Sequence, residues 1–168
     1  IGSEVKIVYE GSGTVDVDGN LYKNGETVTM NASPSHGYGF KEWRDATGNS
    51  IEDNPYTFTM GTEDVTYTAV FEALKLFELT TTVDPVGGGT ITNKDTYSSH
   101  PYGEQITLMA VPAKGYSFKG WKRDGSIVST ELTYSFNMPE EDVAITAVFD
   151  KQYSITFGVG ETEALGQV

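Results

Sequence analysis

Both tryptophans of this 168-residue chain lie in nearly identical heptapeptides, GYGFKEW at Gly37–Trp43 and GYSFKGW at Gly115–Trp121. Indole and phenol rings are frequent at binding interfaces, because an apolar face can stack on a ligand while the N–H or O–H makes a hydrogen bond. Exposed rings in both heptapeptides would form an aromatic platform for a sugar or a peptide. The candidate binding residues are Tyr38, Trp43, Tyr116 and Trp121.

The alternative is that these side chains anchor a hydrophobic core. A core must recur in every copy of a repeat, whereas a specific binding site need not, so the recurrence favours packing. In both heptapeptides the Trp follows the Phe by three residues, which strict alternation along a strand places on opposite faces. Either a β-bulge returns the Trp to the core, or the Trp covers a second surface. Glu42 stands where the second copy has Gly120, which indicates no absolute need for glycine at position 120.

Acidic residues offer two candidate cation sites. DVDGN at Asp16–Asn20 resembles the first half of a calcium loop, but the bidentate Glu is absent at the expected spacing, where Thr27 stands. Asp-Gly is also a strong hairpin signal, so we expect a turn. Acidic residues at Glu63–Asp64 and Glu140–Asp142 recur before the last strand of each copy, where we expect them to blunt a turn. The sequence therefore predicts no metal site.

The residues that usually carry catalysis are sparse. The chain has no cysteine and two histidines. His36 lies in a turn where the second copy has Lys114, and His100 precedes Pro101 in a stretch for which we find no twin. No nucleophile elbow, H-E-x-x-H pair or glycine-rich phosphate loop occurs. We therefore predict no catalytic residue, no cofactor and no enzymatic activity.

An internal repeat is the most diagnostic feature of the sequence. Gly25–Phe71 and Gly103–Phe149 align at a constant offset of 78 residues, with about 20 of 47 positions identical. Upstream, GTVDV from Gly13 matches GTITN from Gly89 at an offset of 76. Repetition at a fixed period indicates a tandem array. YSITFGV from Tyr153 matches the start of the second copy, so a third copy is expected to begin there.

Each copy has the alternation of half-buried strands. Val28, Met30 and Ala32 alternate with polar residues, and turn signals rich in Gly, Asn and Asp separate the apolar runs. No amphipathic helix is evident. We expect about six short strands in about 75 residues, antiparallel or nearly so. A unit of this size is marginal alone, so large aromatic side chains must contribute much of its stability.

Composition excludes several classes of partner. The chain is 38% hydrophobic and 12% aromatic, well above the level of disordered chains. A net charge of −13 argues against nucleic acid and against anionic lipid, both of which need clustered Lys and Arg. No apolar run is long enough to cross a bilayer, so we expect no membrane insertion in this segment. We expect the sequence to be a piece of a longer protein.

The order of these motifs resembles the divergent InlB B-repeat family. The motifs are GTV/GTI, GE-(T/Q)-(V/I)-T, A-x-P, GY-x-F-x-x-W, Y-x-F-x-M, DV and TAVF, and they cover about residues 5–72 and 77–150. The resemblance implies a mainly β fold, β-grasp-like or related, with little or no helix. It also implies an extracellular location, at a bacterial cell surface or secreted. The expected domains are 1–73, 74–151 and, as the first strand of a truncated third unit, 152–168.

From these observations we expect a non-catalytic tandem repeat module that acts as a stalk or spacer with weak adhesion. The alternative is a carbohydrate- or host-protein-binding module that uses exposed aromatic residues. Its partners would be the neighbouring domains of a larger surface protein and, under the alternative, a glycan or host protein. Tyr153, Ile155, Phe157 and Val159 are expected to form a strand that packs on an edge of the second unit or on a neighbouring molecule.

Overall fold

A computed structural model describes residues 1–93 and 95–158. Every regular element within these residues is a β-strand, which confirms the predicted mainly β fold. The first copy contains β1 (Ser3–Glu10), β2 (Gly13–Val17), β3 (Leu21–Tyr22), β4 (Thr27–Pro34), β5 (Tyr38–Asp45), β6 (Ser50–Ile51), β7 (Tyr56–Thr59) and β8 (Val65–Ala73). The second contains β9 (Leu76–Asp84), β10 (Gly89–Asn93), β11 (Ser99–Pro101), β12 (Gln105–Pro112), β13 (Tyr116–Arg123), β14 (Ser126–Ser129), β15 (Thr133–Asn137) and β16 (Val143–Lys151).

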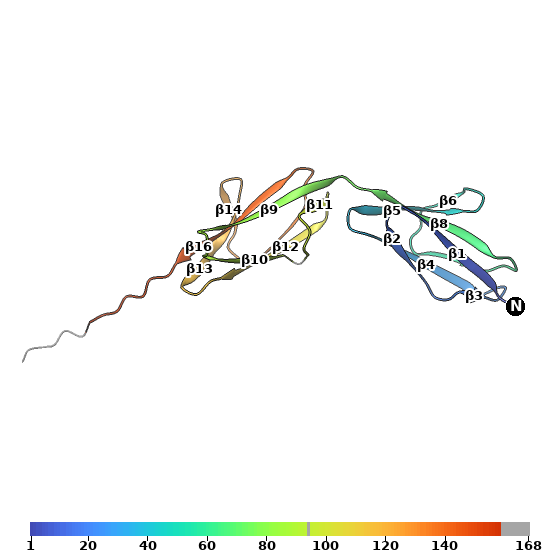
Figure 1. Cartoon of the computed structure of the whole chain (residues 1–168), viewed down its shortest axis with the longest axis horizontal. Helices are drawn as coiled ribbons and strands as arrows, with labels where there is room; N and C mark the ends of the chain where they lie inside the picture. The colour runs from blue at the N-terminus through green and yellow to red at the C-terminus, as the bar shows by residue number, and fades with distance from the viewer. Residues whose placement is uncertain (94, 159–168) are drawn as a thin grey trace, which may run out of the picture. The chain divides into compact units, whose positions relative to one another are not determined.

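The strands of the first copy form two sheets. A five-stranded sheet has the order β3-β1-β8-β5-β6, and a three-stranded sheet has the order β2-β4-β7 (Figure 1). The pairs are antiparallel except for β1 and β8, which run parallel from Val5 opposite Val65 to Glu10 opposite Val70. The first and last strands of the copy therefore lie side by side in the middle of the larger sheet.

The core of the first copy lies between its two sheets. Alternate residues of β4 point inward from the smaller sheet, and Val28 and Met30 are fully buried. The larger sheet contributes Trp43 from β5 with Ala69 and Phe71 from β8. This arrangement is a two-layer all-β fold in which the predicted period of two selects the buried face of each strand.

The second copy repeats this plan. Its sheets have the orders β11-β9-β16-β13-β14 and β10-β12-β15. The same backbone hydrogen bond closes both copies, since Gly25 N donates to Met60 O and Gly103 N donates to Met138 O, each at 2.8 Å. Its buried side chains come from the equivalent strands and include Ile106, Leu108, Ala110, Trp121, Ile145, Ala147 and Phe149.

By its contacts the chain divides into two compact units that differ from the two sequence copies. The first unit comprises Ile1–Leu79 together with Tyr97–Glu104 and Asn137–Asp142. The second comprises Thr80–Thr96, Gln105–Phe136 and the residues from Val143 on. Two short segments of the second sequence copy thus belong to the first compact unit, and the sequence-based boundaries at 73 and 151 stay a prediction.

The glycine of the GTV/GTI motif has a packing role. A Cβ at Gly13 would lie 2.4 Å from Cζ of the buried Phe71 ring, and a Cβ at Gly89 would lie 2.5 Å from Cζ of Phe149. Carbon atoms do not approach this closely, so a side chain at either position displaces a core aromatic ring. The recurrence of glycine there follows from the recurrence of phenylalanine in TAVF.

The start of the expected third copy does not pair in the way we predicted. Tyr153, Ile155 and Phe157 have no strand assignment and are exposed, so the predicted packing on an edge of the second unit is wrong for them. In the first copy, β1 pairs with a strand that follows it by 60 residues, and this chain has no residue so far beyond Tyr153. Val159, the fourth residue of the predicted face, lies outside the described residues. Among those described, no helix is long and apolar enough to cross a membrane.

Candidate functional site

Both tryptophans are core residues. Trp43 and Trp121 are 0% exposed. Their indole N–H groups donate to backbone carbonyls, from Trp43 to Asp53 at 3.1 Å and from Trp121 to Glu131 at 2.9 Å. Each ring also contacts the phenylalanine three residues before it, with ring centroids 5.3 and 5.4 Å apart. The indoles therefore have a satisfied polar tip and a packed apolar face, as buried Trp side chains require.

A β-bulge turns each tryptophan inward. The register between β5 and β8 shifts between Phe40 and Glu42, and the register between β13 and β16 shifts between Phe118 and Gly120. The lysine between them, at position 41 or 119, has no opposite residue in the ladder. One extra residue offsets the three-residue step, so Phe and Trp share a face. The first of the two alternatives left open by the sequence is the one adopted.

Burial removes the tryptophans from the proposed platform. An indole without exposed surface cannot stack on a glycan, so the expectation of Trp43 and Trp121 as exposed binding residues is corrected. Tyr38 and Tyr116 are half-buried at the start of β5 and β13. A role in binding for these two tyrosines stays a prediction, now without the adjacent indole.

Position 120 is more constrained than the comparison of the two copies indicated. Glu42 fits because its carboxylate accepts hydrogen bonds from Arg44 and Ser50 on the outer side of β5. A Cβ at Gly120 would lie 2.8 Å from Ile127 Cγ2 and 2.9 Å from the Ser129 carbonyl oxygen. Close passage of β14 therefore excludes a side chain at position 120, although the twin position carries one.

The DVDGN segment forms a turn around a buried phenol. The hydroxyl of Tyr22 lies 2.9 Å from Asp18 Oδ1 and 3.0 Å from the Gly19 carbonyl oxygen. Asp18 thus accepts a hydrogen bond inside the copy. Burial, and then the hydrogen bond to Asp18, raise the pKa of Tyr22 to about 12.

The raised pKa of Tyr22 predicts a loss of stability at alkaline pH. The folded protein keeps the phenol proton while the unfolded chain, with a pKa of 10.0, releases it. This contribution is present in full below pH 10 and is lost as the pH rises through about 12. The free energy of unfolding should therefore fall more steeply above pH 10 in the native sequence than in Tyr22→Phe. Urea unfolding across this range checks the difference, and parallel curves for the two proteins would contradict it.

The recurring acidic residues fasten the first strand of each copy. Asp64 Oδ1 accepts the backbone N–H of Glu4, and Asp142 Oδ1 accepts that of Glu78, both at 2.7 Å. We had expected these acids only to blunt a turn. Their hydrogen bonds link the turn before the last strand to the start of the first strand, which is a structural reason for the recurrence of DV.

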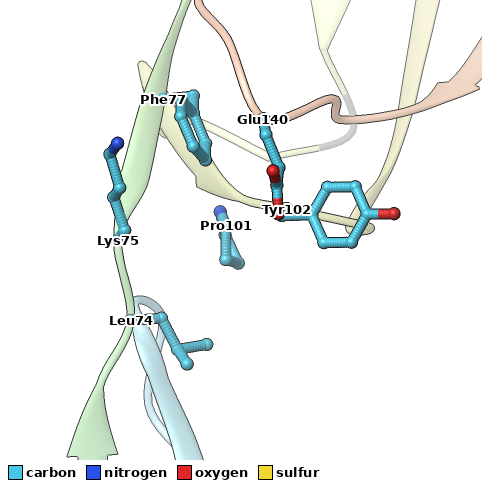
Figure 2. Close-up of a pocket in the computed structure, with 6 residues that line it drawn as sticks. All are labelled: Leu74, Lys75, Phe77, Pro101, Tyr102 and Glu140. Carbon is cyan, nitrogen blue, oxygen red and sulfur yellow. The ribbon is translucent and has the colours of Figure 1, made fainter.

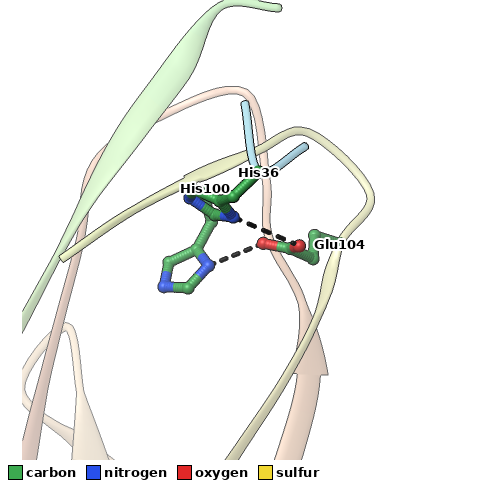
Figure 3. Close-up of side chains that lie close together, drawn as sticks. All are labelled: His36, His100 and Glu104. Carbon is green, nitrogen blue, oxygen red and sulfur yellow. Dashed lines mark hydrogen bonds and ion pairs between the residues drawn. The ribbon is translucent and has the colours of Figure 1, made fainter. Parts of the chain in front are cut away.

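A histidine–glutamate cluster is the group of chemistry-bearing side chains that sequence reasoning missed. Figure 3 shows His36, His100 and Glu104, all within the first compact unit. One ligand atom from each of the three residues lies within 4.8 Å of those of the other two. His100 Nδ1 lies 2.6 Å from Glu104 Oε2, and His36 Nδ1 lies 3.9 Å from Glu104 Oε1. His100 is 0% exposed.

His100 also has a twin, contrary to our reading of the sequence. His100 pairs with Phe77 on β9, just as Tyr22 pairs with Ser3 on β1. Both side chains are buried at the same position of the fold. The signal that could have found this twin is the offset of 78 that begins at Gly25, carried three residues upstream.

A hollow of about 470 Å³ lies near the same segment (Figure 2). Its lining residues are Leu74, Lys75, Phe77, Pro101, Tyr102 and Glu140. Lys75 Nζ lies over the Phe77 ring at 5.1 Å from its centroid. The lining is mixed in polarity and brings no pair of acid and base groups into contact among the interactions described, so it does not point to catalysis.

Fold and repeated core together define a tandem all-β repeat protein. The family model of the divergent InlB B-repeat domain matches the chain twice, over residues 3–75 and 79–153. The chain therefore belongs to the divergent InlB B-repeat family. This family belongs to bacterial surface proteins, and its repeat domains are typically non-catalytic. No curated protein shows a significant match to the chain.

Proposed function

We propose that the chain is a stalk or spacer segment of a bacterial cell-surface or secreted protein, with weak adhesion as a secondary role. Its work in this reading is mechanical. The copies hold a functional domain of the parent protein at a distance from the envelope, and its partners are the neighbouring domains.

The observation that carries this proposal is the burial of the largest side chain in both copies. Trp43 and Trp121 occupy equivalent core positions with their N–H groups satisfied, so the recurring heptapeptide serves stability. A net charge of −13 supports solubility of an array whose copies are close in sequence. The alternative, a binding module that uses exposed aromatic residues, loses the two indoles that motivated it.

One tryptophan in each copy allows the spacer role to be tested by unfolding. In Trp121→Phe the fluorescence reports on Trp43 alone, and in Trp43→Phe it reports on Trp121 alone. We expect two urea transitions that are independent or coupled only between neighbours, because repeat arrays gain stability from each copy and its immediate interfaces. Calorimetry of the unsubstituted chain should then need more than one transition.

A single inseparable transition in all three proteins would contradict the spacer proposal. Adhesion is tested separately with a glycan array probed by the unsubstituted chain. Signal on the array that disappears in a variant with Tyr38 and Tyr116 both changed to Phe would favour the binding module instead.

A further inference from the structure

The two histidines of the cluster each have one ring nitrogen committed to a backbone carbonyl. His36 Nε2 lies 2.7 Å from the Ser99 oxygen, and His100 Nε2 lies 3.2 Å from the Tyr97 oxygen. A carbonyl oxygen accepts and does not donate, so both Nε2 atoms carry a proton. The Tyr97 ring stacks flat on His36, with centroids 3.6 Å apart, and holds its plane.

These tautomers leave both Nδ1 atoms facing one carboxylate. A neutral imidazole protonated at Nε2 has a lone pair at Nδ1, and the Glu104 carboxylate also offers lone pairs. Two acceptors at 2.6 Å repel each other unless a cation lies between them. The cation is either a proton on this contact or a metal ion held by all three residues.

Comparison of the copies shows how the carboxylate became available. In the first copy, Glu26 Oε2 accepts the backbone N–H of Lys23 at 2.7 Å. The equivalent of Lys23 is Pro101, which has no N–H to donate. Glu104, the equivalent of Glu26, therefore directs its carboxylate to His100 instead. Three departures from the first copy thus meet in one cluster, since Tyr22, Lys23 and Lys114 are the twins of His100, Pro101 and His36 in the other copy.

We propose that His36 Nδ1, His100 Nδ1 and the Glu104 carboxylate form a binding site for a divalent transition-metal ion of the zinc class. Two imidazoles and one carboxylate are a ligand set that zinc accepts, with water in the fourth position. Zinc bonds of about 2.0–2.2 Å place tetrahedral ligands roughly 3.3–3.5 Å apart. The ligand atoms lie within 4.8 Å of one another, with contacts at 2.6 and 3.9 Å, so small side-chain shifts close the site.

The outer contacts of the cluster also suit a metal site. Histidines that bind a metal usually donate their second ring N–H to a carbonyl or carboxylate, which fixes the tautomer. Ser99 and Tyr97 supply these carbonyls. Because the chain has no cysteine and no histidine outside the cluster, no second site with nitrogen or sulfur side-chain ligands competes. The site does not depend on the stalk role.

Isothermal titration of the full chain with zinc chloride tests the proposal. The chain itself supplies matched variants, because His100→Tyr and His36→Lys install the residues found at the equivalent positions of the other copy. Both variants retain all the surface carboxylates. We expect the native sequence to bind one equivalent of zinc, and each variant to lose that event or weaken it by about tenfold or more. Glu104→Gln should do the same, and calcium should not replace zinc.

Thermal unfolding and imidazole nitrogen NMR give independent readouts. Zinc should raise the melting temperature of the native sequence and leave that of His100→Tyr unchanged. Zinc should also shift the Nδ1 resonances of both histidines while the Nε2 atoms stay protonated. If the native sequence and both histidine variants bind zinc alike, or if zinc leaves the Nδ1 resonances in place, the cluster is a proton-bridged ion pair and the proposal is overturned.

Discussion

Replacement of Trp121 by alanine is expected to lower the free energy of unfolding of the second copy by about 3–5 kcal/mol. The indole is fully buried, so truncation opens a large cavity beside Phe118. It also leaves the Glu131 carbonyl without the donor that lies 2.9 Å away. A copy of about 75 residues buries too little surface to absorb such a loss easily. Chemical denaturation followed by far-UV circular dichroism measures the change.

Two features of the chain provide controls for this experiment. Trp121→Phe keeps an aromatic ring in the core and loses the hydrogen bond, so it should cost less than Trp121→Ala. Trp43 reports by fluorescence on the first copy, whose transition should stay close to that of the native sequence. A loss below about 1 kcal/mol in Trp121→Ala would contradict the assignment of the indole as a core anchor.

The strands and the repeat could be predicted from sequence because both depend on local patterns. Alternation in Val28–Ala32 selects the buried face of a strand whatever its partner is. Positive φ at the glycine of each heptapeptide was also predictable, and Gly37 and Gly115 have φ of 80° and 85°. The parallel pairing of β1 with β8 was not predictable, since it joins residues 60 positions apart.

The direction of the tryptophans required information that alternation lacks. A three-residue step from Phe118 to Trp121 is compatible with a bulge or with a second covered surface. The choice depends on the ladder with β16, where Lys119 has no opposite residue. Pairing with a distant strand therefore decides which face the largest side chain occupies.

The histidine–glutamate cluster was hidden for a similar reason. His36 and His100 are separated by 64 residues in the sequence and by the different offsets of the repeat, 76 at Gly13 and 78 at Gly25. Between these two glycines the alignment has to absorb two residues, and His100 falls in that interval. Pairing of β11 with β9 resolves the ambiguity, because it places His100 opposite Phe77.

Gly89→Ala is expected to destabilise the second copy by about 1–3 kcal/mol, although Gly→Ala usually stabilises a position with ordinary backbone angles. The added Cβ would lie 2.5 Å from Phe149 Cζ and 2.6 Å from the Val111 carbonyl oxygen. The ring could move only into a packed core, and the carbonyl belongs to the β10–β12 ladder. Steric overlap therefore outweighs the entropy gain. Thermal and urea unfolding of the full chain measure the sign as well as the size.

Gly61→Ala is the matched control, because a Cβ at Gly61 meets nothing within 4 Å. That variant should stay within about 0.5 kcal/mol of the native sequence. Combining Gly89→Ala with Phe149→Leu should restore part of the loss, since a smaller side chain at 149 gives the new methyl group space. The double-mutant cycle should then show a coupling of about 0.5–3 kcal/mol. Additive losses would mean that Phe149 does not set the requirement for glycine, and that the Val111 carbonyl alone excludes a side chain at position 89.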